Sequence, residues 1–174
     1  MTLAGHSLGG YVALLAASRS DRIGRVLAID VKSDWTDDDA AFAERSRGAS
    51  QRVEPEREVL AARLAKSLAP AVLGPDELEL VADRSIEPAE AGWRFRWDRR
   101  VLDTESVDPF AFLTDVRCPA HVMAGSRSDV MPPDKARRFA GAIPGGTVEL
   151  VDGAGHHVEL DAPRIVAERI LELA

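Results

Sequence analysis

The sequence predicts an α/β fold, with a parallel sheet of about four strands flanked by helices. Short apolar segments typical of strands alternate with segments whose apolar residues recur at helical spacing. The order along the chain is β-α-β, a helix-rich insertion, then β-α-β-α, which favours parallel strands joined by right-handed crossovers. The 174 residues, 45% of them hydrophobic, suffice for one sizeable core.

The N-terminal part predicts strand, turn, helix and strand in that order. Residues 3–5 end a strand, and residues 8–18 have the apolar spacing of a helix. Residues 25–30 are an almost continuous apolar run, typical of a parallel strand buried on both faces.

Residues 31–115 interrupt this alternation and predict a helical insertion. Amphipathic helices are expected over 40–47 and 54–68, and a third begins near Pro75, because proline is tolerated in a first helical turn. Residues 93–98 alternate aromatic and charged side chains, as a half-exposed strand does.

The alternation then resumes. Strands are expected over 119–125 and 146–151, with a helix over 134–143 between them. A last helix ends at Leu173, with Asp161 as its predicted N-cap and Pro163 in its first turn. The predicted organisation is core segments 1–30 and 116–174 around an insertion at 31–115.

Composition and charge narrow the class of partners. The net charge of −7 disfavours binding to phosphate backbones or anionic surfaces, so we expect neither nucleic acid nor membrane as partner. No apolar run is long enough to span a bilayer, and no secretory signal is evident. The single cysteine, Cys118, cannot form an intrachain disulfide, which fits a cytoplasmic location.

The strongest chemical signal is the run Gly5-His6-Ser7-Leu8-Gly9, a G-x-S-x-G sequence between a strand and a helix. Small flanking residues let such a turn pack tightly while the serine hydroxyl projects outward. Ser7 is therefore the predicted nucleophile. The Leu8 N–H, at the start of the helix, is the predicted donor to an oxyanion.

A serine nucleophile needs a base, and the chain has four histidines. His6 lies inside the turn and His121 inside a strand, which favours structural roles. His156 and His157 lie in a glycine-rich loop after a strand, where an exposed base can be mounted. His156 is preferred, and His157 remains the alternative.

The base needs a carboxylate to orient it. Asp129 lies just beyond the strand that ends at Gly125. When the serine lies on a strand–helix turn of an α/β sheet, the acid and then the histidine follow it along the chain, as Ser7, Asp129 and His156 do. Asp30, at the end of an earlier strand, is the second choice.

Three stretches, LAGHSLGGYVAL, CPAHVMAGSRSD and VDGAGHHVELDAPRIVAERI, resemble the nucleophile turn, acid loop and histidine loop of the α/β-hydrolase superfamily. Within it the chain is similar to esterase-like members with a helical cap. The resemblance implies a partial α/β-hydrolase fold, a catalytic triad of Ser7, Asp129 and His156, and residues 31–115 as the cap.

The chain also departs from that family. Members begin with about four further strands, and their absence here would leave a sheet edge open and remove the loop that carries the second oxyanion donor. In addition, Asp129 lies one residue farther from Gly125 than in the commonest acid loop. A missing N-terminal half or an oligomer covering the open edge is therefore an expected partner.

These features predict a serine hydrolase acting on a carboxylic ester or a related small acyl substrate. Amide, lactone or carbon–carbon bond hydrolysis on the same triad, and a catalytically impaired or inactive fragment, remain as alternatives. Trp93 and Trp97 are weak candidates for the substrate pocket, since aromatic residues also pack an insertion internally. No cofactor and no metal are expected, because no cluster has metal-ligand spacing and no phosphate-binding glycine loop is present.

Overall fold

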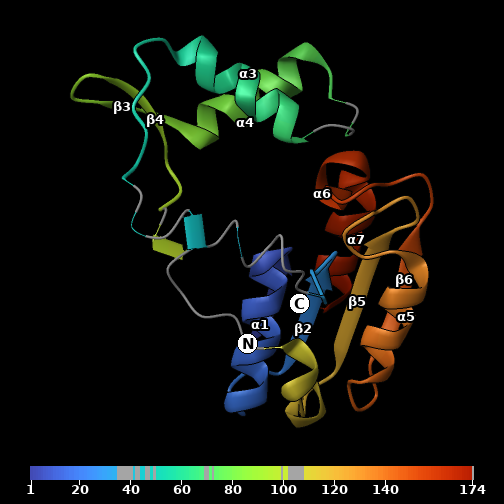
Figure 1. The fold of residues 1–174 in the computed structure, drawn as a ribbon. Coiled ribbons are helices and arrows are strands. Elements are labelled where there is room, and N and C mark those ends of the chain that lie inside the picture. Colours follow the sequence, from blue (N-terminus) through green and yellow to red (C-terminus); the bar gives the residue numbers. More distant parts are fainter. Residues whose placement is uncertain are drawn as a thin grey trace. The chain divides into compact units, whose positions relative to one another are not determined.

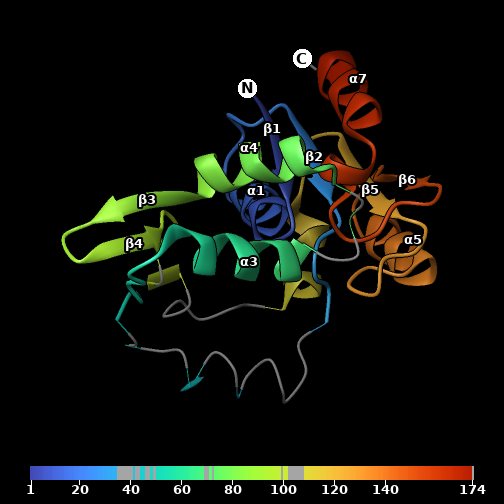
Figure 2. The same ribbon diagram turned by 90° about the horizontal axis from the view of Figure 1, so that it is seen from above.

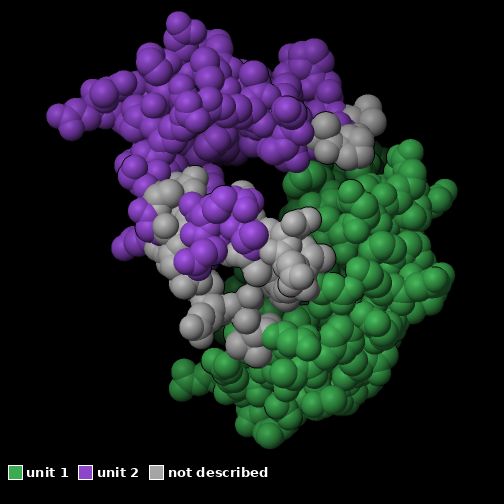
Figure 3. Space-filling view, viewed as in Figure 1, with its two compact units in different colours: residues 1–35, 107–174 green, residues 36–106 purple. Residues whose placement is uncertain are grey.

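The computed structural model describes residues 1–34, 41, 44–45, 48, 50–68, 71, 73–98, 100–101 and 108–173. The chain divides into two compact units, coloured in Figure 3. The core unit comprises residues 1–35 and 107–174, and the insertion unit comprises residues 36–106. The insertion unit is therefore shorter at both ends than the predicted 31–115.

A four-stranded parallel sheet forms the centre of the core unit (Figure 1), as the sequence predicts. In spatial order its strands are β1 (Thr2–His6), β2 (Arg25–Ile29), β5 (Ala120–Gly125) and β6 (Thr147–Val151). Because all the strands are parallel, their carboxyl ends meet at one edge of the sheet, where ligand sites of open α/β sheets are found.

Helices cover both faces of this sheet. They are α1 (Leu8–Arg19) and α5 (Pro133–Gly141) on one face, and α6 (Val158–Asp161) and α7 (Pro163–Leu173) on the other. Figure 2 shows β5 and β6 between α5 and α7. Side chains of β2 alternate between the two faces, as strand geometry requires: Val26 and Ala28 pack with α1 and α5, and Leu27 and Ile29 with α7.

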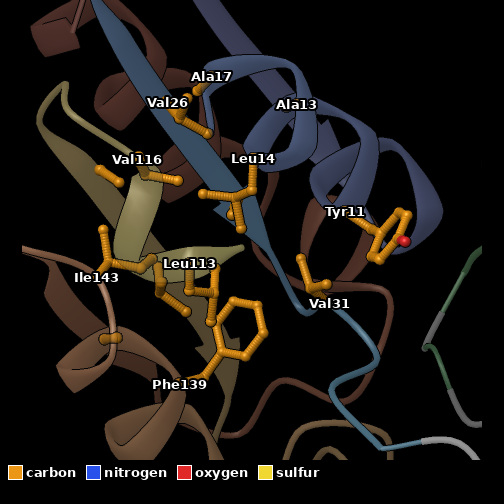
Figure 4. Packing of buried hydrophobic residues seen from close by; sticks show 14 of the residues in the cluster. Tyr11, Ala13, Leu14, Ala17, Val26, Val31, Leu113, Val116, Phe139 and Ile143 are labelled. Atoms are coloured by element: carbon orange, nitrogen blue, oxygen red, sulfur yellow. The ribbon is translucent and has the colours of Figure 1, made fainter. Parts of the chain in front are cut away.

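The larger of the two resulting cores also includes two short 3-10 helices, η2 (Pro109–Ala111) and η3 (Leu113–Asp115). Figure 4 shows Leu14 of α1, Leu113 of η3 and Phe139 of α5 packed together, and all three are fully buried. Close packing of side chains from these three segments stabilises this face of the sheet.

The predicted N-cap at Asp161 is wrong. Helix α7 begins at Pro163, and the Ala162 carbonyl accepts the first helical bond, from the Val166 N–H. Asp161 instead ends α6, and its carboxylate accepts a 2.8 Å hydrogen bond from the Gly155 N–H. It therefore holds the loop that precedes α6.

The insertion unit contains α3 (Arg57–Leu68), α4 (Pro75–Ser85) and the antiparallel pair β3 (Ile86–Ala89) and β4 (Gly92–Phe95). Its buried core is small and consists of Leu60, Ala82 and Ile86. Strand β3 was not expected from the sequence, and the helix expected over 40–47 falls mainly outside the described residues. None of the described helices is long and apolar enough to cross a membrane.

Candidate active site

Ser7 occupies the turn between β1 and α1, as predicted. Its backbone has φ 51° and ψ −120°, and its N–H donates a 2.8 Å hydrogen bond to the Ile29 carbonyl of the neighbouring strand. A positive φ is costly for a residue other than glycine, and such strain is concentrated at functional sites. The strained turn is held in place by the sheet beside it.

The glycines around Ser7 differ in what they do. A Cβ at Gly5 would lie 2.3 Å from the carbonyl carbon of Gly9, and one at Gly10 would lie 2.6 Å from a methyl group of Val31. A Cβ at Gly9 would meet nothing within 4 Å. The close strand–helix approach therefore requires Gly5 and Gly10. The G-x-S-x-G motif includes Gly9 and not Gly10, yet Gly10 is the glycine that packs closely against Val31, just after β2.

His156 faces a buried carboxylate. Its Nδ1 lies 2.7 Å from Oδ1 of Asp30, which directly follows β2 and is completely buried. A carboxylate can only accept, so Nδ1 carries the imidazole proton and Nε2 keeps its lone pair. This is the tautomer that a general base acting through Nε2 needs.

Two further donors fix the Asp30 carboxylate. The Ser128 hydroxyl donates to Oδ1 at 2.6 Å, and the Gly125 N–H donates to Oδ2 at 3.0 Å. Burial of an ionised carboxylate is costly unless it is hydrogen-bonded, and these contacts meet that condition. The carboxylate is thus held rigidly behind His156.

Asp129 does not occupy the predicted position. Its side chain is exposed, and its neighbour Ser128 is the residue that turns inward toward Asp30. The physical reason is burial: Asp30, just after β2, is completely buried and meets His156, whereas Asp129, in the loop after β5, faces solvent. The structure therefore corrects the preferred acid partner of His156 from Asp129 to the second choice, Asp30.

The loop that carries His156 lies directly against β5. A Cβ at Gly125 would lie 2.2 Å from the Gly155 carbonyl oxygen, and the Arg127 N–H donates to the Ala154 carbonyl at 2.9 Å. Together with the bond from Gly155 to Asp161, these contacts set the position of the loop.

Ser7 and His156 lie on segments held together by His6. The His6 Nε2 lies 2.9 Å from the His156 carbonyl oxygen, and the two imidazole rings are 4.6 Å apart. Among the described residues, no hydrogen bond joins the Ser7 hydroxyl to His156. Leu8 is the first residue of α1, so its N–H is one of the four without an acceptor inside the helix.

The model of the "Alpha/beta hydrolase family" matches residues 2–169, nearly the whole chain. The chain belongs to this family. Solved structures resemble the chain as well: E-2-(acetamidomethylene)succinate hydrolase (23% identity, TM-score 0.77), an M. tuberculosis esterase (19%, 0.78) and a carboxylesterase from Bacillus subtilis (23%, 0.63). A comparison with curated proteins found no significant match.

The three alignments cover 99%, 98% and 99% of this chain but 65%, 61% and 59% of the solved chains. The chain thus spans less than two thirds of their length. At these identities the likeness shows a common fold.

His157, the alternative base, faces a different carboxylate. Its Nδ1 lies 3.4 Å from Oε1 of Glu159, and the same oxygen lies 3.3 Å from Nδ1 of His6. Burial lowers the pKa of the His6 imidazole, and Glu159 offsets this only in part. Burial raises the pKa of Glu159, but the hydrogen bond from His157 and the charge of His6 bring it below its usual value.

The two tryptophans proposed for the pocket belong to the insertion unit. Trp93 packs against the small core of that unit, beside Leu60 and Ile86. Trp97 is 45% exposed and lines a cavity of about 630 Å³ within the same unit, together with Arg63 and Phe95. Trp93 thus has the internal packing role, whereas Trp97 borders open space.

Proposed function

We propose that the chain is a serine hydrolase that acts on a carboxylic ester or a related small acyl substrate, with Ser7 as nucleophile, His156 as base and Asp30 as acid. One observation carries the proposal: the 2.7 Å contact between His156 Nδ1 and the buried Asp30 carboxylate, beside a serine on a strained strand–helix turn. Asp30 replaces Asp129 in the triad proposed from the sequence.

In this reaction the Ser7 hydroxyl attacks the acyl carbonyl while His156 Nε2 accepts its proton. The Leu8 N–H stabilises the oxyanion that forms on the carbonyl oxygen. His156 then gives the proton to the leaving alcohol, and an acyl group remains on Ser7. Water, deprotonated by His156, releases the carboxylic acid and restores the serine. Asp30 orients the imidazole and stabilises its charged form throughout.

The substrate class is supported by the chemistry of the triad and by the family. Three solved structures that resemble the chain are named as a hydrolase, an esterase and a carboxylesterase. Amide, lactone and carbon–carbon bond hydrolysis proceed through the same groups, so they remain within the proposal. No step of the mechanism uses a cofactor.

A second candidate is an impaired hydrolase that needs a further segment or a second chain along β1. Two observations favour it: β1 is the outermost strand and pairs only with β2 among the described residues, and Ser7 makes no hydrogen bond to His156 there. A single oxyanion donor in place of two typically costs about 10²–10³ in rate.

The deciding experiment is covalent labelling of the purified 174-residue chain with a fluorophosphonate, measured by intact mass. Ser7→Ala removes the proposed nucleophile. Ser18→Ala is the matched control, because Ser18 lies in α1 and its hydroxyl donates to the Leu15 carbonyl.

Stoichiometric labelling that is lost in Ser7→Ala and kept in Ser18→Ala is the expected result. A folded chain that resists the reagent would overturn the proposal for the isolated chain and favour the impaired form. Parallel assays with a p-nitrophenyl ester and the corresponding anilide then separate ester from amide hydrolysis.

A further inference from the structure

A cluster of three possible metal ligands lies next to the proposed triad and takes no part in it. His6 ends β1, His157 directly precedes α6, and Glu159 lies within α6. One ligand atom from each lies within 4.8 Å of the other two. The prediction that no metal site is present rested on spacing along the sequence, and the fold brings His6 to residues about 150 positions away.

The hydrogen bonds of His6 fix which of its nitrogens can bind a cation. Its Nε2 lies 2.9 Å from the His156 carbonyl oxygen, which can only accept, so Nε2 carries the proton. In the neutral ring the lone pair is then on Nδ1, which faces the Glu159 carboxylate at 3.3 Å. Two acceptors that face each other repel, and a cation between them removes the repulsion. Metal-binding histidines typically donate their other N–H to a backbone carbonyl in this way.

The carboxylate points to the same conclusion. Glu159 Oε1 lies 3.3 Å from His6 Nδ1 and 3.4 Å from His157 Nδ1. Two ligands of a tetrahedral zinc ion, each about 2.0–2.1 Å from the metal, are separated by about 3.3–3.4 Å. The other oxygen, Oε2, is buried and has no hydrogen-bond partner among the described residues. The carboxylate thus keeps acceptor capacity toward a cation.

We propose that His6 Nδ1, His157 Nδ1 and the Glu159 carboxylate bind one divalent transition-metal ion of the Zn²⁺ class. Two imidazoles and one carboxylate are a ligand set that suits Zn²⁺ or Co²⁺ and disfavours Mg²⁺, which prefers oxygen ligands alone. A bound ion joins the end of β1 to the segment that follows β6, where the ligands His157 and Glu159 lie. None of the three ligands belongs to the triad, although His6 directly precedes Ser7 and His157 directly follows His156.

The test is titration of the metal-free chain with Co²⁺, followed by visible absorption, because tetrahedral Co²⁺ gives characteristic bands. We expect saturation at one ion per chain, displacement of Co²⁺ by Zn²⁺, and no response to Mg²⁺. Glu159→Gln and His157→Gln should each weaken binding at least about tenfold, as the loss of a direct ligand requires.

Glu149→Gln is the matched control. Glu149 forms a similar contact with His121, 3.1 Å between Oε2 and Nε2, but the described residues supply no third ligand there. This variant should bind Co²⁺ as the wild type does. Circular dichroism shows whether each variant is folded.

A wild-type chain without a stoichiometric Co²⁺ site would disprove the proposal, whatever the variants do. So would unchanged affinity in folded Glu159→Gln, because the ion would then be bound elsewhere. Fluorophosphonate labelling of Ser7 is a separate measurement, and its failure leaves the metal result interpretable.

Discussion

The two units of the molecule are stabilised in different ways. In the core unit, helices cover both faces of a parallel sheet, and the buried side chains come from strands, helices and loops far apart in the sequence. In the insertion unit the core consists of Leu60, Ala82 and Ile86. The insertion unit also carries ion pairs whose carboxylates are exposed, for example those of Arg57 with Glu79 and Asp83.

This contrast matters because surface ion pairs contribute little stability, whereas buried apolar area contributes most of it. The proposed catalytic groups all lie at the carboxyl edge of the core unit, on loops that the large core holds. The insertion unit contributes a cavity lined partly by Trp97. The reactivity of Ser7 should therefore depend on the stability of the core unit, and destabilising substitutions in the insertion unit should affect it less.

The largest expected effect separates the two acid candidates within the core unit. Asp30→Asn should reduce the rate of Ser7 labelling or ester hydrolysis about 10³–10⁴-fold, because an amide can no longer fix the required tautomer of His156. Asp129→Asn is the control and should change the rate less than about threefold, as expected for an exposed residue.

NMR chemical shifts of the His156 ring nitrogens report its tautomer independently of any measurement of activity. A larger loss in Asp129→Asn than in Asp30→Asn would restore the acid preferred from the sequence and contradict the geometry.

A core substitution in each unit tests the contrast directly. Phe139→Ala should cost about 3–5 kcal/mol, because Phe139 is completely buried in the larger core. Leu60→Ala should cost about 2–5 kcal/mol, confined to the insertion unit. Hydrogen exchange should show lost protection in β5 and α1 for the first variant, and in α3 and α4 for the second.

Labelling of Ser7 should survive Leu60→Ala and fail near the lowered unfolding temperature of Phe139→Ala. Loss of protection across both units in Leu60→Ala would mean that the units unfold together, which would contradict the view that each unit is stabilised by its own core.

The smallest effect concerns two adjacent glycines of α1. Gly10→Ala should destabilise the chain by about 1–3 kcal/mol, because its Cβ would lie 2.6 Å from Val31. Gly9→Ala should be neutral or stabilise by up to about 1 kcal/mol, because the site is open and alanine favours helix. Urea denaturation of the matched pair gives both free energies of unfolding. Equal losses in the two variants would show that the turn is less tightly packed than the structure indicates.

Much of the fold could be predicted because the signals are local. The apolar run at 25–30 indicated a strand buried on both faces, and β2 has this burial. The strand–Ser7–helix sequence located the turn for the same reason. Of the antiparallel pair, the sequence indicated a strand near β4 but not β3. Strand β3 (Ile86–Ala89) follows α4 directly, without residues that signal a turn.

The site was predictable in part. Ser7 and His156 were found because motif and loop chemistry point to them within a few residues of sequence. Asp30 ranked second because strand-terminal aspartates are common. A signal was nevertheless present: a carboxylate that ends a continuously buried strand needs hydrogen-bond partners, and the buried Ser128 supplies one.

The sequence by itself therefore determined the parallel α/β class, the family and the position of the serine turn, all of which depend on short-range patterns. Tertiary structure decided which carboxylate meets His156, because the loop after β6 places its imidazole against the buried Asp30 and leaves Asp129 exposed. It also decided that His6 meets His157 and Glu159. Such contacts join residues more than a hundred positions apart, and no local periodicity records which of them become neighbours.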